Sequence, residues 1–223
     1  MNYALVFLAA CTTATPVAPE AWQLDQDRVI AVRSSPPGLA AGEHALVDAL
    51  IAHAGGPTTV ETPYSLNAAH SPLSGTVNYL FDHFELIAPD EPTLADARTQ
   101  LGIAAGLPIP LEVEADFEIH TFITQRRVLL GMHYDNADLG TIMIAGQPAG
   151  ITITVARDST VALEARGGAP IVRWLTSCGE LVDSAEPDAV LHTGTPCTGE
   201  LVVVGRDPMT TGTGWRVSPL TVE

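Results

Sequence analysis

Residues 111–117, LEVEADF, decide the fold class of this chain. Four apolar residues alternate with three acidic ones, so an extended chain here has one apolar face and one acidic face. Residues 121–130 follow after a short break and have the composition of a hairpin partner. The two segments together predict an antiparallel sheet that buries one of its faces.

Short strand-like segments separated by turns continue on both sides of this hairpin. Residues 43–53 fit a helix or a strand by period alone, but the flanking PPG and GGP breakers favour a strand. Turns recur about every 8 to 12 residues, a spacing typical of an antiparallel sandwich. We expect strands at residues 27–35, 43–53, 58–66, 141–145, 151–156, 161–165, 171–176, 189–192, 201–206 and 214–222.

One helix is expected among these strands. Asp90 suits the N-cap and Gly102 the C-terminal stop, and Leu94, Ala97 and Leu101 would share one apolar face between them. A single short helix in a β-rich chain is usually a connection between strands. The polar segment 132–139, MHYDNADL, lies between two β-rich halves and is the expected domain boundary. The sequence therefore predicts an all-β protein with two sandwich domains, residues 22–131 and 139–223, and one short connecting helix.

The charge composition excludes some classes of partner. The 223 residues include 26 acidic and 10 basic residues, all ten of them arginine, for a net charge of −16. Nucleic-acid binding requires clustered cations on the protein surface, so we expect no nucleic-acid partner, and no basic patch for a membrane surface. Acidic surfaces keep proteins soluble and in some proteins bind Ca²⁺.

The N-terminus has the pattern of an export signal. Residues 1–10 are largely apolar and end in small residues, and the sequence LAAC at residues 8–11 resembles the lipobox of bacterial lipoproteins. We expect cleavage before Cys11, acylation of its thiol, and a Thr/Pro/Ala-rich tether at residues 11–21. The segment before the apolar residues has no Lys or Arg, which a start site upstream of Met1 would explain; a chance LAAC in a cytosolic chain is the alternative. Thr12 matches the sorting pattern for the outer membrane, so the expected location is an outer-membrane lipoprotein facing the periplasm or the cell surface.

The cysteine count agrees with export. Three cysteines are an odd number, and removal of a lipidated Cys11 leaves Cys178 and Cys197 as a pair. In an oxidising compartment these two would form a disulfide. A metal site is the alternative, but two cysteines without a further pair or a histidine cluster are poor zinc ligands.

Two stretches resemble a known group of proteins. Residues 27–52, DRVIAVRSSPPGLAAGEHALVDALIA, resemble the start of an immunoglobulin-like module common in lipoproteins of myxobacteria and their relatives. The stretches IVRWLTSCGEL (171–181) and GELVVVGRDPMTTGTGW (199–215) resemble the closing module of the same proteins. The resemblance implies two immunoglobulin-like β-sandwich modules and a cell-envelope location. It departs at residues 63–67, where the relatives often have a Trp and a Cys, so the first module would have no disulfide.

The sequence contains no recognised catalytic motif: HExxH, GxSxG, SxxK, a P-loop and GxGxxG are all missing, so we expect no enzyme and no catalytic residues. The densest polar and aromatic group is residues 79–86, where Tyr79, Phe81 and His83 are candidates for contacts with a small ligand or glycan. A hydrolase would instead need a cleft that joins a histidine to carboxylates from this segment.

The expected boundary segment contains Asp135, Asn136 and Asp138, which could hold Ca²⁺, although turns rich in Asp and Asn are commoner than calcium sites. No other cofactor is expected. The predicted function is a non-catalytic, lipid-anchored envelope lipoprotein with a structural or interaction role. The expected partners are the bilayer, through acylated Cys11, and an envelope protein or glycan bound by end loops or a strand edge.

Overall fold

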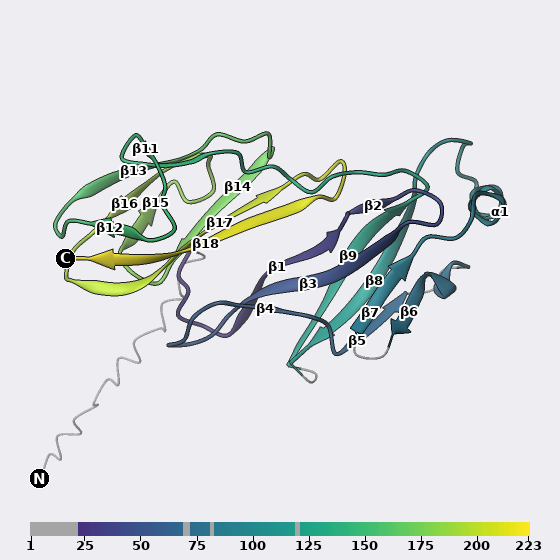
Figure 1. Ribbon diagram of the computed structural model, residues 1–223, viewed down its shortest axis with the longest axis horizontal. Coiled ribbons are helices and arrows are strands. Elements are labelled where there is room, and N and C mark those ends of the chain that lie inside the picture. Colours follow the sequence, from purple (N-terminus) through teal and green to yellow (C-terminus); the bar gives the residue numbers. More distant parts are fainter. Residues whose placement is uncertain (1–21, 69–71, 81–82, 119–120) are drawn as a thin grey trace, which may run out of the picture.

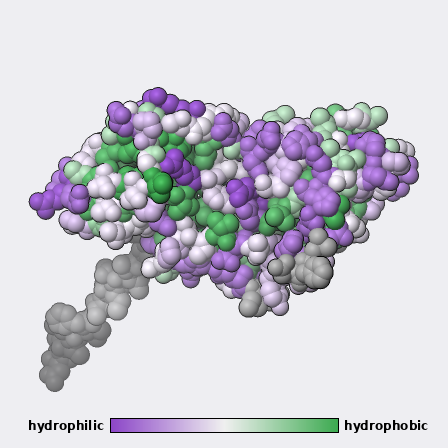
Figure 2. All heavy atoms as spheres, viewed as in Figure 1, coloured by the Kyte–Doolittle hydropathy of each residue, from purple (hydrophilic) through white to green (hydrophobic). Residues whose placement is uncertain are grey.

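The computed structural model describes residues 22–68, 72–80, 83–118 and 121–223. Cys11 with the expected signal and tether, and Phe81, lie outside these residues. The described chain is mostly β: four sheets form two β-sandwiches, with one short α-helix, as the sequence predicts (Figure 1). The space-filling view shows the sandwiches as two lobes (Figure 2). No helix among the described residues is long and apolar enough to span a bilayer.

The first sandwich has two sheets. One has the strand order β1-β3-β7-β6, with β4 also paired to β3, and the other has the order β2-β9-β8-β5. The elements of the first sheet are β1 (Arg28–Ser35), β3 (His44–Ala52), β4 (Thr59–Glu61), β6 (Val77–Leu80) and β7 (His83–Ile87). Those of the second are β2 (Gly38–Leu39), β5 (Ser65–Ala68), β8 (Ile109–Phe117) and β9 (Phe122–Leu130). A 3₁₀ turn, η1 (Ser74–Thr76), precedes β6, and α1 (Glu91–Leu101) joins β7 to β8.

The second sandwich repeats this plan. Its sheets have the orders β11-β10-β13-β16-β15 and β12-β18-β17-β14. The first sheet comprises β10 (Ile142–Ile144), β11 (Gln147–Pro148), β13 (Thr160–Ala165), β15 (Glu180–Val182) and β16 (Asp188–His192). The second comprises β12 (Ile153–Val155), β14 (Ile171–Thr176), β17 (Cys197–Arg206) and β18 (Thr213–Val222).

Both sandwiches share one topological feature that defines their class. In each sandwich the chain begins in the five-stranded sheet and then crosses to the four-stranded sheet. There a short strand runs parallel to the last strand of the domain: β2 pairs with β9, and β12 pairs with β18. In the first sandwich, Pro36 and Pro37 separate β1 from β2, where a missing N–H interrupts the ladder and lets the chain change sheets. In each sandwich a five-stranded sheet packs on a four-stranded sheet that includes the parallel edge strand, and this is an immunoglobulin-like arrangement.

The strand that indicates the fold has the expected orientation. Leu111, Val113, Ala115 and Phe117 of β8 are all buried in the first core, and β9 is its antiparallel partner. Glu114 is exposed as predicted. Asp116 is buried, in contrast to the expectation of a uniformly solvated acidic face.

The helix has the predicted ends. Asp90 accepts a hydrogen bond from the backbone N–H of Thr93 (3.1 Å), and Gly102 closes the helix in the left-handed conformation. Its buried face differs from the prediction, because Leu101 is 47% exposed and Arg98 is buried instead. The guanidinium of Arg98 is compensated there by Glu91 (2.7 Å) and by a backbone carbonyl.

One predicted strand is wrong. Residues 58–66 form two short strands in different sheets, because β4 pairs with β3 whereas β5 pairs with β8 across the sandwich. Pro63 lies between them, and a proline cannot donate to a sheet ladder. The segment crosses from one sheet to the other where the sequence suggested a continuous strand.

The second core surrounds Trp174, which is 1% exposed and donates its indole N–H to the carbonyl of Glu186 (3.0 Å). Cys178 is buried in the same core and is disulfide-bonded to Cys197, with a Cα–Cα distance of 5.9 Å. The bond joins the end of β14 to the start of β17. The cysteine pair expected from the sequence is thus present.

Candidate functional site at the junction of the two sandwiches

The two sandwiches meet through a buried apolar seam. Along β3, Ala49 and Ile51 face the first core, whereas Leu50 and Ala52 face the second sandwich. Along β17, alternate residues likewise face the second core or the first sandwich. The seam comprises Leu24, Ala31, Leu50, Ala52, Leu175, Val202 and Val204, with Ile30, Trp215 and Val217 packed against it.

Two unbroken apolar runs in the sequence correspond to this seam. Residues 49–52, ALIA, and 201–204, LVVV, have no alternation of apolar and polar residues, and all eight are at most 3% exposed. A strand buried on both faces has this composition. The runs were the sequence signal for a close contact between domains, which reasoning from alternation alone missed.

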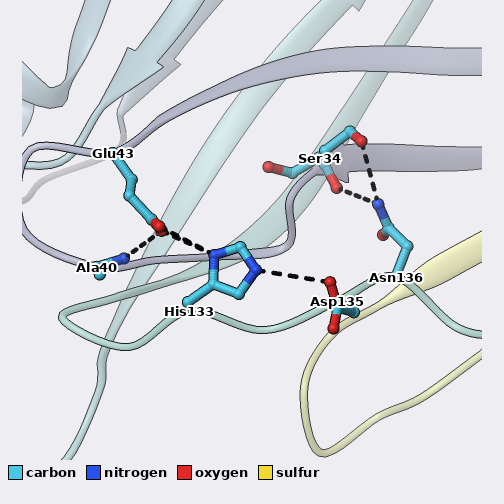
Figure 3. Close-up of polar contacts among 7 residues, drawn as sticks. Ser34, Ala40, Glu43, His133, Asp135 and Asn136 are labelled. Carbon is cyan, nitrogen blue, oxygen red and sulfur yellow. Dashed lines mark hydrogen bonds and ion pairs between the residues drawn. The ribbon is translucent and has the colours of Figure 1, made fainter.

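Asn136 connects both sandwiches to the segment between them, and Figure 3 shows its contacts with the first sandwich. Its side-chain Nδ2 donates to the carbonyl of Ser34 (3.1 Å) and lies 3.4 Å from the hydroxyl of Ser35, at the end of β1. Its Oδ1 accepts from the backbone N–H of Thr213 (3.0 Å), at the start of β18. One side chain thus satisfies backbone groups from both domains.

Two arginines add hydrogen bonds across the junction. The register of β1 against β3 shifts between Val29 and Ala31, so Ile30 is a bulge residue, and its carbonyl accepts from Arg206 of β17 (2.9 Å). In the other direction, Arg126 of β9 donates to the carbonyl of Thr211 in the turn before β18.

Burial acts on both of these guanidinium groups. It lowers the pKa of Arg126 to about 10, and the nearby charge of Arg206 adds to this effect. Burial also lowers the pKa of Arg206, with a further contribution from the charge of Arg173. Arg206 of β17 therefore lies close enough to repel both Arg126 of β9 and Arg173 of β14.

The start of the described chain lies on the second sandwich rather than on the first. The N–H of Leu24 donates to the carbonyl of Thr176 (3.0 Å), and the N–H of Thr176 donates to the carbonyl of Trp22 (2.9 Å). Trp22 packs against the second core, and Leu24 is part of the seam. Residues 22–24 thus extend the edge of the sheet at β14 before the chain enters the first sandwich.

His133 lies on the surface close to Asn136, between two carboxylates (Figure 3). Its Nδ1 is 2.9 Å from Glu43, and its Nε2 is 3.5 Å from Asp135. The hydrogen bond to Glu43 raises the pKa of His133 above its ordinary value. Hydrogen bonds from His133 and from the N–H of Ala40 lower the pKa of Glu43. All three side chains are solvent-exposed, so the group is a surface ion pair that joins the segment after β9 to the residue before β3, within reach of the first sandwich only.

Two of the predicted ligand-contact residues, Tyr79 and His83, lie on opposite faces of one hairpin. In the β6–β7 hairpin, Tyr79 pairs with Phe84, and their ring centroids are 4.9 Å apart. His83 pairs with Leu80, the neighbouring position, so its side chain leaves the opposite face of the hairpin from that of Phe84. Tyr79 is 63% exposed, but it cannot act with His83 on a common face. Phe81 lies outside the described residues.

The predicted calcium residues have other contacts. Asn136 bridges the domains, Asp138 accepts from the N–H of Gly140 (2.7 Å), and Asp135 contacts His133. Among the residues that the structure describes, no group of three or more His, Cys, Asp or Glu side chains could hold a metal ion. The calcium site therefore stays a prediction to which the described side chains lend no support.

Neither a protein-family model nor a curated protein sequence matches the chain. Among solved structures, the D0–D1 domains of intimin are similar at 16% identity, over 86% of this chain and 98% of that one, with a TM-score of 0.27. The fibronectin(III)-like modules of Clostridium thermocellum CbhA match at 12% identity over 86% and 94%, with a TM-score of 0.30. The titin domains Z1Z2, in complex with telethonin, match at 12% identity over 89% and 97%, with a TM-score of 0.25. With scores this low, the fold assignment rests on the strand order itself.

Proposed function

We propose that this chain is an exported, lipid-anchored protein of the bacterial cell envelope with a non-catalytic, structural or interaction role. The observation that carries the proposal is the distribution of its three cysteines. Cys178 and Cys197 are bonded to each other, which leaves Cys11, directly after the apolar segment, as the one cysteine outside the pair. A buried disulfide in a small β-sandwich is typical of proteins that fold in an oxidising compartment.

The junction supports a structural role. Seven buried apolar residues and the hydrogen bonds of Asn136, Arg126 and Arg206 join the sandwiches, so the two domains form one stiff unit. A stiff pair of immunoglobulin-like domains on a tether presents its loops and strand edges at a fixed spacing. The histidine–carboxylate pair closest to the junction, His133 with Glu43, is solvent-exposed, a setting that suits an ion pair better than general acid–base chemistry.

The test is fractionation of the full chain expressed in a bacterial host, compared with Cys11→Ser. We expect the wild type in the membrane fraction, with an intact mass that begins at an acylated Cys11, and the variant in the soluble fraction. Cys178→Ser is the control, because it makes the same Cys-to-Ser replacement, here at a disulfide cysteine, but leaves the anchor position intact; any of it that folds should stay with the membrane. A wild-type chain that is soluble and begins at Met1 would contradict the proposal.

A further inference from the structure

A groove at the junction is lined by three of the ten arginines of the chain. It has a volume of about 290 Å³, close to the lower limit for small-ligand sites. We call it the arginine groove; its lining residues are Arg28, Val29, Ile30, Arg173, Leu175, Val204 and Arg206. Both sandwiches contribute, since residues 28–30 belong to β1 and the others to β14 and β17.

The sheet register explains why the cations meet. Arg173 of β14 pairs with Val204 of β17, and Arg206 lies two residues further along β17, so both arginines leave the same face of the sheet. That face is the one turned toward the first sandwich, with Leu175 as the next residue on it. Arg28 approaches from the first sandwich, on the other side of the groove.

The groove carries a positive charge that its own lining does not neutralise. No lining residue is acidic among those the structure describes, although the charge of Asp25 acts on Arg28 from nearby. Arg173 is exposed, and its guanidinium forms no hydrogen bond or ion pair with any described residue. The chain as a whole has a net charge of −16, so the local positive charge of this group of arginines is opposite in sign to the net charge of the protein.

A second hollow continues the groove along the junction and shares Arg206 with it. Arg126 lines this hollow, and its Nε is buried with no hydrogen-bond partner among the described residues, while its terminal nitrogen binds the carbonyl of Thr211. A buried guanidinium nitrogen without a partner costs free energy unless an acceptor reaches it. Arg127 also lines the hollow, but Glu112 neutralises it (2.6 Å).

The shape and charge of the groove restrict the ligand. Guanidinium groups bind carboxylate and phosphate oxygens through paired N–H donors, and the floor of Leu175, Val204 and Ile30 suits a small apolar or ring-shaped body. A long polyanion would be repelled by the net charge of −16, whereas a small anion meets mainly the local charge. We propose that the arginine groove binds a small organic oxoanion that carries a carboxylate or phosphate group. The inference does not depend on whether Cys11 is acylated.

The experiment is a nuclear magnetic resonance titration of the full chain with its disulfide intact. Inorganic phosphate and glucuronate are the anionic probes, and glucose is the neutral one. We expect saturable shifts of the Leu175 and Val204 amides with one or both anions, with a Kd on the order of 1 mM, weakening as salt is added. Saturation with phosphate alone assigns a phosphate ester, and saturation with glucuronate alone assigns a carboxylate.

Two variants test the assignment to the groove. Arg173→Ala should weaken binding about tenfold, because it removes one charge-assisted contact without breaking a hydrogen bond between the domains. Arg157→Ala is the matched control, since it removes the same charge from an exposed position away from the groove lining. Equal weakening by both variants, or anion-induced shifts no larger than those with glucose, would overturn the proposal. Neither result would bear on the membrane fractionation.

Discussion

The coupling between the two sandwiches can be tested with two substitutions on one strand. Leu46 and Leu50 both belong to β3 and both leave its outer face, but Leu50 is fully buried against the second sandwich, whereas Leu46 is 52% exposed. Leu50→Ala removes three buried carbon atoms, or about 2.4 kcal/mol at roughly 0.8 kcal/mol each. The cavity left between two packed sheets raises the expected loss to about 3 kcal/mol. Leu46→Ala changes the same strand and the same residue type, and should cost no more than about 1 kcal/mol.

The assay is urea unfolding followed by tryptophan fluorescence. All three tryptophans lie on or beside the second sandwich: Trp174 lies in its core, Trp22 packs against that core, and Trp215 packs on its outer face at the seam. A substitution in the first sandwich therefore shifts the fluorescence transition only through the junction. We expect Leu50→Ala to lower the unfolding free energy by about 2 kcal/mol more than Leu46→Ala does. Equal transitions for the two variants would refute the inference that the seam holds the domains together in solution.

Three further outcomes are expected. Replacing Cys178 and Cys197 together by Ser opens a loop with a sequence separation of 19. The free energy of unfolding should fall by about 3 kcal/mol. An unchanged urea midpoint would contradict this expectation. The pKa of His133 is raised, so its ion pair contributes its full stability below the ordinary pKa of 6.5. This stability is lost as the pH rises through the raised pKa. His133→Asn should therefore lower the Tm near about pH 6 and not near about pH 9. The same Tm difference at both pH values would argue against the pair. Gly38→Ala should lower the free energy of unfolding by roughly 1–3 kcal/mol in the same urea assay, because the new Cβ would overlap the ring of Tyr134. A variant as stable as the wild type would show that this close approach is absent.

The sequence was most informative where one local pattern determines one structure. Alternation in β8, the Asp90 cap with its Gly102 stop, and the parity of the cysteines each depend on neighbouring residues or on a count, and each predicted a feature that is present. The prediction of one strand over residues 58–66 failed because it, too, relied on the local pattern alone. Its composition suits a strand, but the change of sheets near Pro63 depends on partners distant in the chain.

The arginine groove could not be predicted from local pattern. Arg28, Arg173 and Arg206 stand far apart in the sequence, and only the packing of β1 on β14 and β17 brings them to one place. The separation of Tyr79 and His83 has a related cause, because residues four apart share a face in a continuous strand but not across a tight hairpin. The sequence shows which residues alternate along a strand, whereas the position of the β6–β7 turn determines which residues of the hairpin lie on the same face.

The attachment of residues 22–24 to β14 determines how this molecule would carry mechanical load. Leu24 and Trp22 are hydrogen-bonded to Thr176, and β18, the last strand, belongs to the same sheet. Because residues 22–24 and β18 run parallel on either side of β14 and β17, tension between the chain before Trp22 and the chain after Val222 shears that sheet lengthwise. The first sandwich lies outside this line of force. It would stay folded and unstretched until the bonds at Thr176 break, so its loops would keep their geometry on a chain under tension.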